Sequence, residues 1–244
     1  MRNIIVTGGS RGIGLGIVRK LATSGFQVIA ISRTRGTGLD TVIKDAAEEG
    51  VGRVSYFQQD LGDIEALSDA ARELRRQFGP IYGVVNNAGI GMSGLLCNMH
   101  ATDIERLTRL NIISPLVFTK HLLRSMLAAR AGRIVNISSI VAVTGYQGIS
   151  AYSATKSAML GFTRSLAREV GSVGITVNAI LPGFVETEMT LDMDDASKRK
   201  IAHRSALGRL TTIDDVANTV DYLVSDQAHG ITGSLMVVDA GATA

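Results

Sequence analysis

Short apolar runs alternate with helical segments along the whole chain, and this alternation limits the fold more than any other feature. The runs are rich in Val and Ile and lack a clean polar–apolar alternation, which is typical of strands buried on both faces. The predicted strands are Asn3–Thr7, Gln27–Ile31, Arg53–Gln58, Ile81–Asn86, Gly132–Ile137, Ile175–Leu181 and Leu235–Val238. The predicted helices cover residues 12–24, 38–49, 63–78, 101–130, 150–172 and 213–225. This order predicts an α/β fold, a Rossmann-type doubly wound parallel sheet of about seven strands with helices on both faces.

No linker or repeat interrupts the pattern, so residues 1–244 are predicted to form one NAD(P)-binding domain. Residues 182–210 break the rhythm, because they begin with Pro182-Gly183 and contain no clear strand. They follow the sixth strand at the carboxyl edge of the sheet, where ligands bind in such folds. They are interpreted as a substrate lid, and the alternative is a surface excursion that covers the sheet.

Composition excludes several classes of protein. Hydrophobic residues make up 45% of the chain, enough for a large core and too many for a disordered protein. The net charge is only +3, and the short cluster Lys198-Arg199-Lys200 is interpreted as a solvated helix face, so no nucleic-acid partner is expected. With a single cysteine, Cys97, no apolar run as long as a membrane span and no signal peptide, the chain is predicted to be cytoplasmic. No membrane partner and no metal site are expected.

A glycine-rich segment joins the first strand to the first helix. It reads Thr7-Gly8-Gly9-Ser10-Arg11-Gly12-Ile13-Gly14. Glycines let the backbone approach a pyrophosphate closely, and the N-terminus of the next helix favours negative charge. The spacing differs from the P-loop of nucleotide triphosphatases, so a dinucleotide is favoured over a plain turn or a triphosphate site. The predicted cofactor contacts here are Gly8, Ser10, Arg11, Gly12, Ile13 and Gly14.

The end of the second strand indicates which dinucleotide is bound. An NAD site places an acidic residue here for the ribose 2′-hydroxyl, but none occurs between residues 26 and 39. Arg33 follows the strand instead, and Arg11 lies in the glycine loop. Two guanidinium groups suit a 2′-phosphate, so the predicted cofactor is NADP(H). The alternative is that the arginines of this loop are solvated charges.

Asp60 and Leu61 follow the third strand. The Asp60 carboxylate is positioned to accept a hydrogen bond from the adenine amino group. The alternative is a turn residue that caps the helix predicted to begin near Asp63.

Three residues after the fifth strand have the types needed for proton transfer. Ser139 precedes Tyr152 by thirteen positions, and Tyr152 and Lys156 are spaced i, i+4 on one helix face. A nearby ammonium lowers the pKa of a tyrosine from roughly 10 toward neutral pH. The tyrosine would then exchange a proton with a developing alkoxide. A Tyr and a Lys at this spacing are common in amphipathic helices, and Ser139 alone is equally weak evidence. The combination of the three residues indicates a catalytic site.

Together these motifs resemble the short-chain dehydrogenase/reductase family along nearly the whole chain. The matching pieces, in the family's order, are Thr7-Gly8-x-x-x-Gly12-x-Gly14, Asn86-Asn87-Ala88-Gly89, Asn111, Ser139, Tyr152-x-x-x-Lys156 and Pro182-Gly183. The resemblance implies hydride transfer between a nicotinamide and a carbonyl or alcohol carbon.

The resemblance also implies a role for each matching residue. Tyr152 would be the general acid/base, Lys156 would lower its pKa and hold the nicotinamide ribose, and Ser139 would hydrogen-bond the substrate carbonyl. Asn111 would position a water that relays protons to Lys156; its other interpretation is a polar residue that breaks a long helix. The remaining implied contacts are Asn87, Ala88 and Gly89 with the adenosine half, Pro182, Gly183, Val185 and Thr187 with the nicotinamide end, and Phe184 with the substrate.

Within the family the chain is most similar to the 3-oxoacyl-[acyl-carrier-protein] reductases. The segments that support this are residues 9–14, 165–170, 182–190 and 231–233. Arg130 occupies a position that is often basic in this group, and it would be a docking residue for an acidic acyl carrier protein. Val173 and Ile149 depart from the pattern, which weakens carrier docking but leaves the hydride chemistry unchanged.

Three functions follow. The first is an NADPH-dependent reductase of 3-oxoacyl thioesters. The second is a reductase of the same fold for another ketone, such as a polyketide, a quinone or a free ketone. The third is a catalytically silent NADP(H)-binding scaffold, which the intact catalytic set disfavours. The resemblance also implies a homotetramer in which the helices 101–130 and 150–172 pair between subunits and residues 229–244 pack at another interface.

Overall fold

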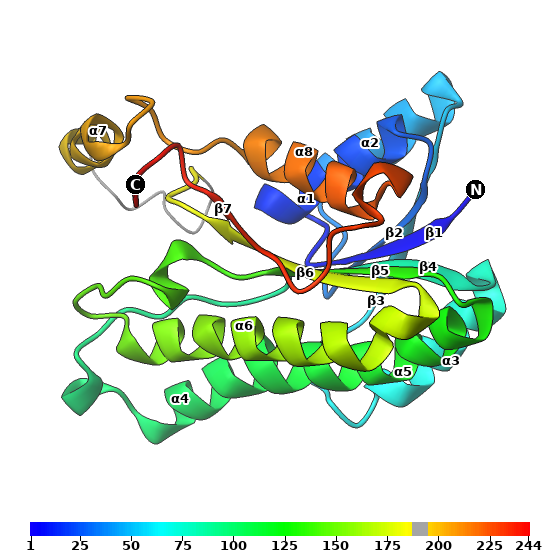
Figure 1. The fold of residues 1–244 in the computed structure, drawn as a ribbon, viewed down its shortest axis with the longest axis horizontal. Helices are drawn as coiled ribbons and strands as arrows, with labels where there is room; N and C mark the ends of the chain where they lie inside the picture. The colour runs from blue at the N-terminus through cyan, green and yellow to red at the C-terminus, as the bar shows by residue number, and fades with distance from the viewer. Residues whose placement is uncertain (187–194) are drawn as a thin grey trace.

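The computed structural model describes residues 1–186 and 195–244 and confirms the alternation of strands and helices (Figure 1). Seven parallel strands form one sheet in the order β3-β2-β1-β4-β5-β6-β7. Their bounds are β1 Asn3–Thr7, β2 Gln27–Ser32, β3 Arg53–Gln58, β4 Ile81–Asn86, β5 Gly132–Ile137, β6 Ile175–Pro182 and β7 Leu235–Val238. β2 and β6 are each one residue longer than predicted, because Ser32 and Pro182 continue the pairing with the next strand.

Helices cover both faces of the sheet (Figure 1). One layer contains α1 (Gly12–Thr23), α2 (Thr37–Glu49) and α8 (Ile213–Val224), and the other contains α3 (Leu67–Phe78), α4 (Ala101–Thr108), α5 (Ser114–Ala129) and α6 (Ser150–Val170). Each layer has its own buried apolar cluster against the sheet. Among the described residues, no helix is both long and apolar enough to cross a membrane.

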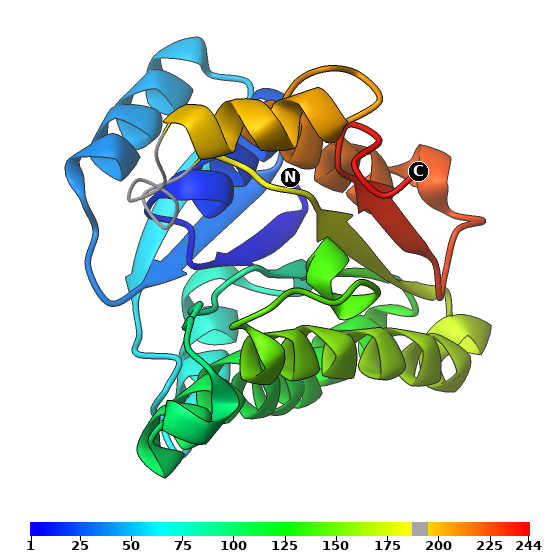
Figure 2. The same cartoon turned by 90° about the vertical axis from the view of Figure 1, so that its left-hand side faces the viewer.

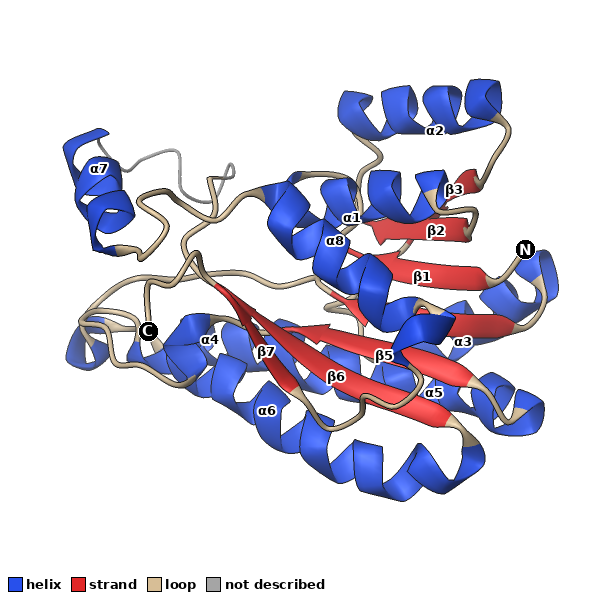
Figure 3. Cartoon of the chain, turned by 45° about the horizontal axis from the view of Figure 1, so that its top comes forward, coloured by secondary structure: helices blue, strands red, loops and turns tan. Residues whose placement is uncertain are grey.

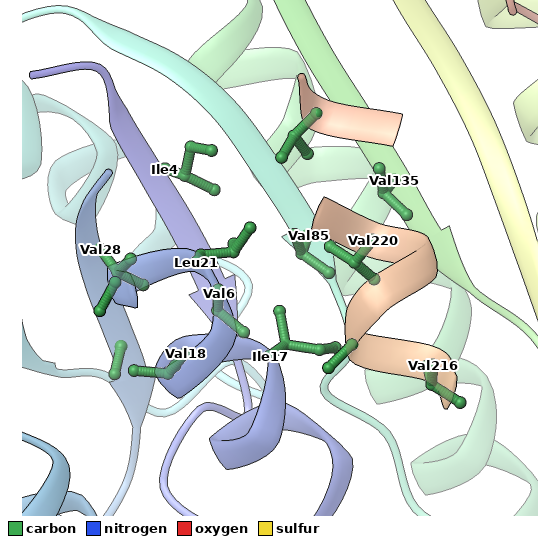
Figure 4. Close-up of a cluster of buried hydrophobic side chains, with 14 of the residues drawn as sticks. Ile4, Val6, Ile17, Val18, Leu21, Val28, Val85, Val135, Val216 and Val220 are labelled. Carbon is green, nitrogen blue, oxygen red and sulfur yellow. The ribbon is translucent and has the colours of Figure 1, made fainter. Parts of the chain in front are cut away.

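The cluster under α1 and α8 fixes the helix that follows the glycine loop (Figure 4). Ile17 and Leu21 of α1 are fully buried against the strands and against Val220 of α8. Burying side chains of this size contributes roughly 1.5–3 kcal/mol each. The N-terminus of α1 is therefore held at the carboxyl end of β1.

The carboxyl ends of β1 and β4 form the crevice where the strand order reverses. β1 pairs with β2 on one side and with β4 on the other, so the chain leaves these two ends in opposite directions. Ligands of doubly wound folds bind outside such a switch point. The sheet therefore places the glycine loop and the segment after Asn86 side by side.

Three helix predictions need correction. The helix predicted from residue 63 begins at Leu67, because the carboxylates of Asp60 and Asp63 accept backbone N–H bonds and form turns first. The single helix predicted over 101–130 is interrupted by a π-helical turn at Arg109–Ile113. Residues 182–210 contain none of the six predicted helix ranges, but the structure contains α7 (Asp195–Arg204) there, in line with the interpretation of the Lys198-Arg199-Lys200 cluster as a helix face.

A buried amide network ties the sheet to the helices of the site. Asn86 on β4 donates to the side-chain oxygen of Asn136 on β5 at 2.8 Å and to Thr119 on α5 at 3.0 Å. Asn136 in turn donates to Thr163 on α6 at 2.8 Å. Buried polar groups are costly without partners, so these bonds fix where α5 and α6 lie on the sheet.

Candidate active site

The glycine loop has the shape that a dinucleotide requires. Gly8 and Gly12 have positive φ values of 67° and 53°, which residues with a side chain rarely adopt. A Cβ added to Gly14 would lie only 2.1 Å from the carbonyl oxygen of Gly8 and 2.5 Å from Nδ2 of Asn87. The first N–H groups of α1 have no partner within the helix and point out of this tight turn. The loop therefore fits the close approach of a pyrophosphate to the backbone.

Thr7 and Asn87 fasten the two sides of the crevice together. The Thr7 hydroxyl accepts hydrogen bonds from the backbone N–H groups of Asn87 and Ala88 at 2.9 and 3.0 Å. The Asn87 side-chain amide donates to the carbonyl oxygens of Thr7 and Gly8 at 2.9 and 3.3 Å. Thr7 was in the matched motif but had no predicted role. The side-chain NH₂ group of Asn87 therefore holds the glycine loop. The predicted contact between Asn87 and the adenosine half of the cofactor would be made by other atoms of this residue.

The loop after β2 lies beside the glycine loop. A Cβ on Gly36 would be 3.7 Å from the carbonyl oxygen of Ser10. Arg11, Arg33 and Arg35 are all exposed, and Arg35 forms an ion pair with Asp40. The positive charge of these two loops therefore lies at the surface, where an anionic group would bind.

Asp60 acts as a turn residue. Its Oδ1 atom accepts a hydrogen bond from the backbone N–H of Gly62 at 2.8 Å, and Leu61 beside it is buried against the core. Asp60 is thus the turn residue of the alternative interpretation, but it does not cap a helix, because α3 begins only at Leu67. The contact with adenine remains a prediction that would use the other carboxylate oxygen.

The carboxyl end of β5 gathers the predicted proton-transfer residues. Ser139 lies two residues beyond the strand, and its hydroxyl accepts from the backbone N–H of Val141 at 3.3 Å. Lys156 is buried and donates from Nζ to the carbonyl oxygen of Ile137, the last residue of β5, at 3.0 Å. The same Nζ lies 5.7 Å from the centre of the Tyr152 ring. The hydroxyl of Ser138 donates to the backbone of Lys156, so the strand end also holds the α6 turn.

Asn111 lies in the π-helical turn and is almost fully buried. Its side-chain oxygen accepts from the Ile90 N–H at 2.9 Å, and its NH₂ group donates to the Ile90 carbonyl and to the Thr155 hydroxyl. Single π turns are frequent at functional sites. Asn111 lies where the long helix is interrupted, as its other interpretation has it, and its side chain joins the loop after β4 to α6. Since both amide N–H groups are used, the predicted water relay to Lys156 would depend on the main chain of this turn.

Gly89 shows how close Asn111 and Lys156 come. A Cβ at this position would lie 3.1 Å from Oδ1 of Asn111 and 3.6 Å from Nζ of Lys156. A larger residue would push against both side chains. The segment Asn87–Gly89 therefore links the cofactor loop to the catalytic residues.

Burial controls the pKa values at this site. It raises the pKa of Tyr152 to about 12 and lowers the pKa of Lys156 to about 8. The expectation that Lys156 lowers the pKa of Tyr152 is therefore not met in this geometry, because the ammonium points to the Ile137 carbonyl. Tyr152 stays protonated at neutral pH, which is the form that can donate a proton to a developing alkoxide.

We expect ketone reduction to lose activity in alkaline solution. Tyr152 keeps its proton well beyond pH 10, but Lys156 loses its charge as the pH rises through about 8. The kcat/KM for the ketone should be level below that value and fall above it. Replacing Lys156 with Arg should move the fall to higher pH, because the guanidinium stays charged. A wild-type profile that is level to pH 10 would contradict this assignment.

Four predicted residues lie at the end of β6. The Pro182 backbone pairs with Val238, and the Gly183 N–H donates to the carbonyl of Val238 at 2.9 Å. A Cβ on Gly183 would lie 2.7 Å from the Cβ of Asp239, so a larger residue does not fit. Phe184 follows, and Val185 is buried and bridges to Thr211. Thr187 lies outside the described residues.

Apolar side chains surround the catalytic loops. Leu95 and Leu96 after β4 are 51% and 57% exposed, and Val143 and Tyr146 after β5 are 56% and 54% exposed. A 2.7 Å hydrogen bond from the Gly94 N–H to the Gly148 carbonyl joins the two loops. We call these four residues the apolar rim. A cavity of about 300 Å³ adjoins it between α4, the π turn and the start of α6.

Arg130, the residue predicted to dock a carrier protein, is not at this mouth. Arg130 ends α5, whose 16 residues extend about 24 Å from the catalytic side of the sheet to its amino edge. Val173 packs against the core beneath α5 and α6, and Ile149 is the residue before α6. Arg130 therefore lies at the amino edge of the sheet, and its role in docking a carrier protein stays a prediction.

Comparison with known proteins shows the family to which the chain belongs. A family model described as enoyl-(acyl carrier protein) reductase matches residues 8–243. The chain belongs to the short-chain dehydrogenase/reductase family and is an NAD(P)-dependent oxidoreductase.

Individual members of the family are similar to this chain over nearly its whole length. The chain is 38% identical to the 3-oxoacyl-[acyl-carrier-protein] reductase FabG of Aquifex aeolicus, over 97% of this chain and 95% of the relative. A gluconate 5-dehydrogenase from Burkholderia cenocepacia in complex with NADP and tartrate is 28% identical, with a TM-score of 0.92 over 99% of this chain and 95% of the other. A blue fluorescent protein from a metagenomic library in complex with NADPH is 33% identical, with a TM-score of 0.92 over 100% of this chain and 98% of the other.

Proposed function

We propose that the protein uses NADPH to reduce the ketone of a 3-oxoacyl thioester to the 3-hydroxyacyl product. The observation that supports it most is the position of Lys156, whose Nζ donates to the carbonyl oxygen of Ile137, two residues before Ser139, and lies 5.7 Å from the centre of the Tyr152 ring. The likeness to FabG supports the same substrate. An acyl thioester offers a hydrocarbon chain that the apolar rim would contact.

Each catalytic residue has a chemical task in this proposal. When bound, reduced nicotinamide supplies the hydride. The Ser139 hydroxyl donates a hydrogen bond to the ketone oxygen as negative charge develops there. Tyr152 then transfers its phenolic proton to that oxygen. Lys156 contributes its positive charge and binds the ribose hydroxyls of the nicotinamide half.

The exposed arginines support NADP(H) as the cofactor. Arg11 and Arg33 lie on neighbouring loops at the end of β2, where a 2′-phosphate would be placed. Arginine binds phosphate through two parallel hydrogen bonds and keeps its charge at all working pH values. The NADP and NADPH named with two similar structures are consistent with this.

Replacing Arg33 with Ala should change cofactor preference. We expect the KM for NADPH to rise by about tenfold or more, since a hydrogen bond to a charged group contributes about 1.5–3 kcal/mol. The KM for NADH should stay nearly constant. The matched control is Arg35→Ala, because Arg35 is already paired with Asp40. Equal losses with both cofactors, or a larger loss from Arg35→Ala, would contradict the assignment.

A second substrate class comes from the gluconate 5-dehydrogenase likeness. A sugar acid carries hydroxyl groups and a carboxylate, which need polar partners. The apolar rim does not supply them, so the acyl thioester is favoured. The same hydride transfer would also reduce a polyketide, a quinone or a free ketone, which are the alternative substrates.

A substrate panel tests the proposed function. NADPH oxidation is followed with acetoacetyl-CoA, crotonyl-CoA and 5-oxogluconate at equal concentrations. The first presents a ketone, the second the carbon–carbon double bond that the enoyl reductase description implies, and the third a sugar acid. The fastest turnover is expected with acetoacetyl-CoA. Faster turnover of either other compound would overturn the proposal.

We also propose a homotetramer and a cytoplasmic location. α5 and α6 present a broad face with Leu116 and Leu127 exposed on α5 and Gly161 exposed on α6, and Ile113 is exposed at the end of the π turn. Small residues on one helix beside apolar ones on the next suit close helix packing between copies. If an acyl carrier protein docks at Arg130, it would serve the site of a neighbouring subunit. A light-scattering mass equal to one 25.8 kDa chain would exclude the tetramer.

Within residues 182–210 we propose that the described part acts as a cover for the substrate. α7 lies beyond the carboxyl ends of the strands, on the same edge as the end of β5 and the start of α6 (Figure 3). Lys198 on α7 pairs with Glu186 at 3.0 Å, which ties the helix to the segment after β6. This edge is where ligands of doubly wound folds bind.

A further inference from the structure

The last residues of the chain form a tight turn around Asp239. This residue follows β7 and is only 7% exposed. Its Oδ1 atom accepts from the Gly241 N–H at 2.9 Å, and its Oδ2 atom accepts from the N–H and the hydroxyl of Thr243 at 2.9 and 2.7 Å. Ala240 and Gly241 both have positive φ values, 56° and 78°. The carboxylate thus stabilises a backbone shape that an Ala disfavours.

This turn is attached to the end of α7. The N–H groups of Ala206 and Leu207 donate to the carbonyl oxygens of Gly241 and Ala240, at 3.2 and 3.0 Å. A Cβ on Gly241 would lie 2.6 Å from the Cβ of Ala206, so the two segments are in contact. Figure 2 shows the C-terminal segment directly beside the chain that leaves α7. The described part of the chain thus joins α7 to the sheet through backbone bonds that depend on the turn.

Asp239 also packs against Gly183, which is a predicted contact of the nicotinamide end of the cofactor. Its Cβ leaves no space for a side chain on Gly183, and Gly183 is bonded to the preceding residue of β7. Asp239 therefore lies between the end of β6 and the turn that holds α7. A change in the turn would alter the attachment of α7. The end of β6 would keep its hydrogen bond between Gly183 and Val238.

We propose that Asp239 is a positioning residue for substrate binding: its carboxylate shapes the C-terminal turn, and the turn fixes the base of α7 above the catalytic edge. The substrate named in this inference rests on the proposed function. The effect of Asp239 on α7 rests on the hydrogen bonds alone. It assigns a role within each subunit to residues 239–244, which the sequence had linked to an interface.

The test compares Asp239→Ala and Thr243→Val with the wild-type protein. Removing the carboxylate should raise the KM for acetoacetyl-CoA about tenfold, because three hydrogen bonds to a charged group are lost. The NADPH Kd should stay within about twofold, because the glycine loop is on other strands. Thr243→Val keeps two of the three bonds and should give a smaller rise of about threefold.

A second measurement follows α7 without any substrate. Trypsin cleaves after the basic residues of α7, which include Lys198, Arg199, Lys200 and Arg204. Cleavage there, located by mass spectrometry, should be about tenfold faster in Asp239→Ala and intermediate in Thr243→Val, because local opening exposes the helix. The matched control is Asp226→Ala, which loses an ion pair with Arg2 far from α7 and should leave both measurements unchanged.

Unchanged cleavage of α7 in Asp239→Ala would overturn the proposal. An NADPH Kd that rises in parallel with the KM would do so as well, because it would indicate a general loss of structure. If the Asp239 variant does not fold, Thr243→Val decides the question with the same two measurements. If wild-type protein does not reduce acetoacetyl-CoA, the proposed function fails, and the cleavage result still decides whether Asp239 holds α7.

Discussion

Replacing Tyr152 with Phe should lower kcat for ketone reduction by about a thousandfold, because the general acid is removed. In the described structure the Tyr152 hydroxyl makes no hydrogen bond, so its loss should leave the fold intact. Lys156 keeps its bond to the Ile137 carbonyl in this variant. NADPH binding, measured by fluorescence, should therefore change by less than about twofold.

The matched control is Tyr146→Phe, which removes the same hydroxyl from an exposed tyrosine of the apolar rim. Its kcat should equal that of the wild type. Full activity in Tyr152→Phe would contradict the catalytic assignment. Equal losses in the two variants would show that the hydroxyl effect is unspecific.

Replacing Gly14 with Ala should abolish tight cofactor binding. The new Cβ would lie 2.1 Å from the Gly8 carbonyl oxygen and close to Asn87, and both belong to the rigid walls of the crevice. The loop must open to admit the methyl group, which typically costs about 1–3 kcal/mol of stability. We expect the NADPH Kd, measured by titration, to rise about a hundredfold, because the backbone N–H groups lose their alignment.

Gly171→Ala is the control for this change, because a Cβ at Gly171 meets nothing within 4 Å. It should leave NADPH affinity and thermal stability close to the wild type. If Gly14→Ala lowered the melting temperature but bound NADPH normally, the glycine loop would not be the pyrophosphate site.

The repeating pattern was enough to predict the strands and the layered fold. All seven predicted strands are present, because runs such as Ile4 to Val6 are buried on both faces and leave no alternative. The spacing of Tyr152 and Lys156 likewise places both on α6. Local residue order decides these features, so they can be inferred without tertiary contacts.

Other features depend on contacts that no local pattern contains. The π turn at Asn111 exists because its side chain is held by Ile90 and Thr155 from two other segments. Likeness predicts Arg130 as a docking residue, but only the direction of α5 shows that it lies at the amino edge of the sheet. The amide network from Asn86 to Asn136 likewise joins two strands far apart in sequence.

The pKa of Tyr152 likewise depends on tertiary contacts that the local sequence does not contain. A lysine four residues away predicts a lowered pKa for the phenol, but the Lys156 ammonium turns to the end of β5 and burial dominates. Whether two groups at i, i+4 interact depends on the partners that tertiary packing supplies. The protonated phenol that results is the form that donates a proton during ketone reduction.

The central claim is that a ketone carbon of a 3-oxoacyl thioester receives a hydride from NADPH at this site. The most direct test incubates the protein with acetoacetyl-CoA and NADPH that carries deuterium at both positions of the nicotinamide C4. The account predicts 3-hydroxybutyryl-CoA with one deuterium at C3, located by mass spectrometry, and far less product when NADH replaces NADPH. Recovery of unchanged acetoacetyl-CoA, or of product without deuterium at C3, would contradict it.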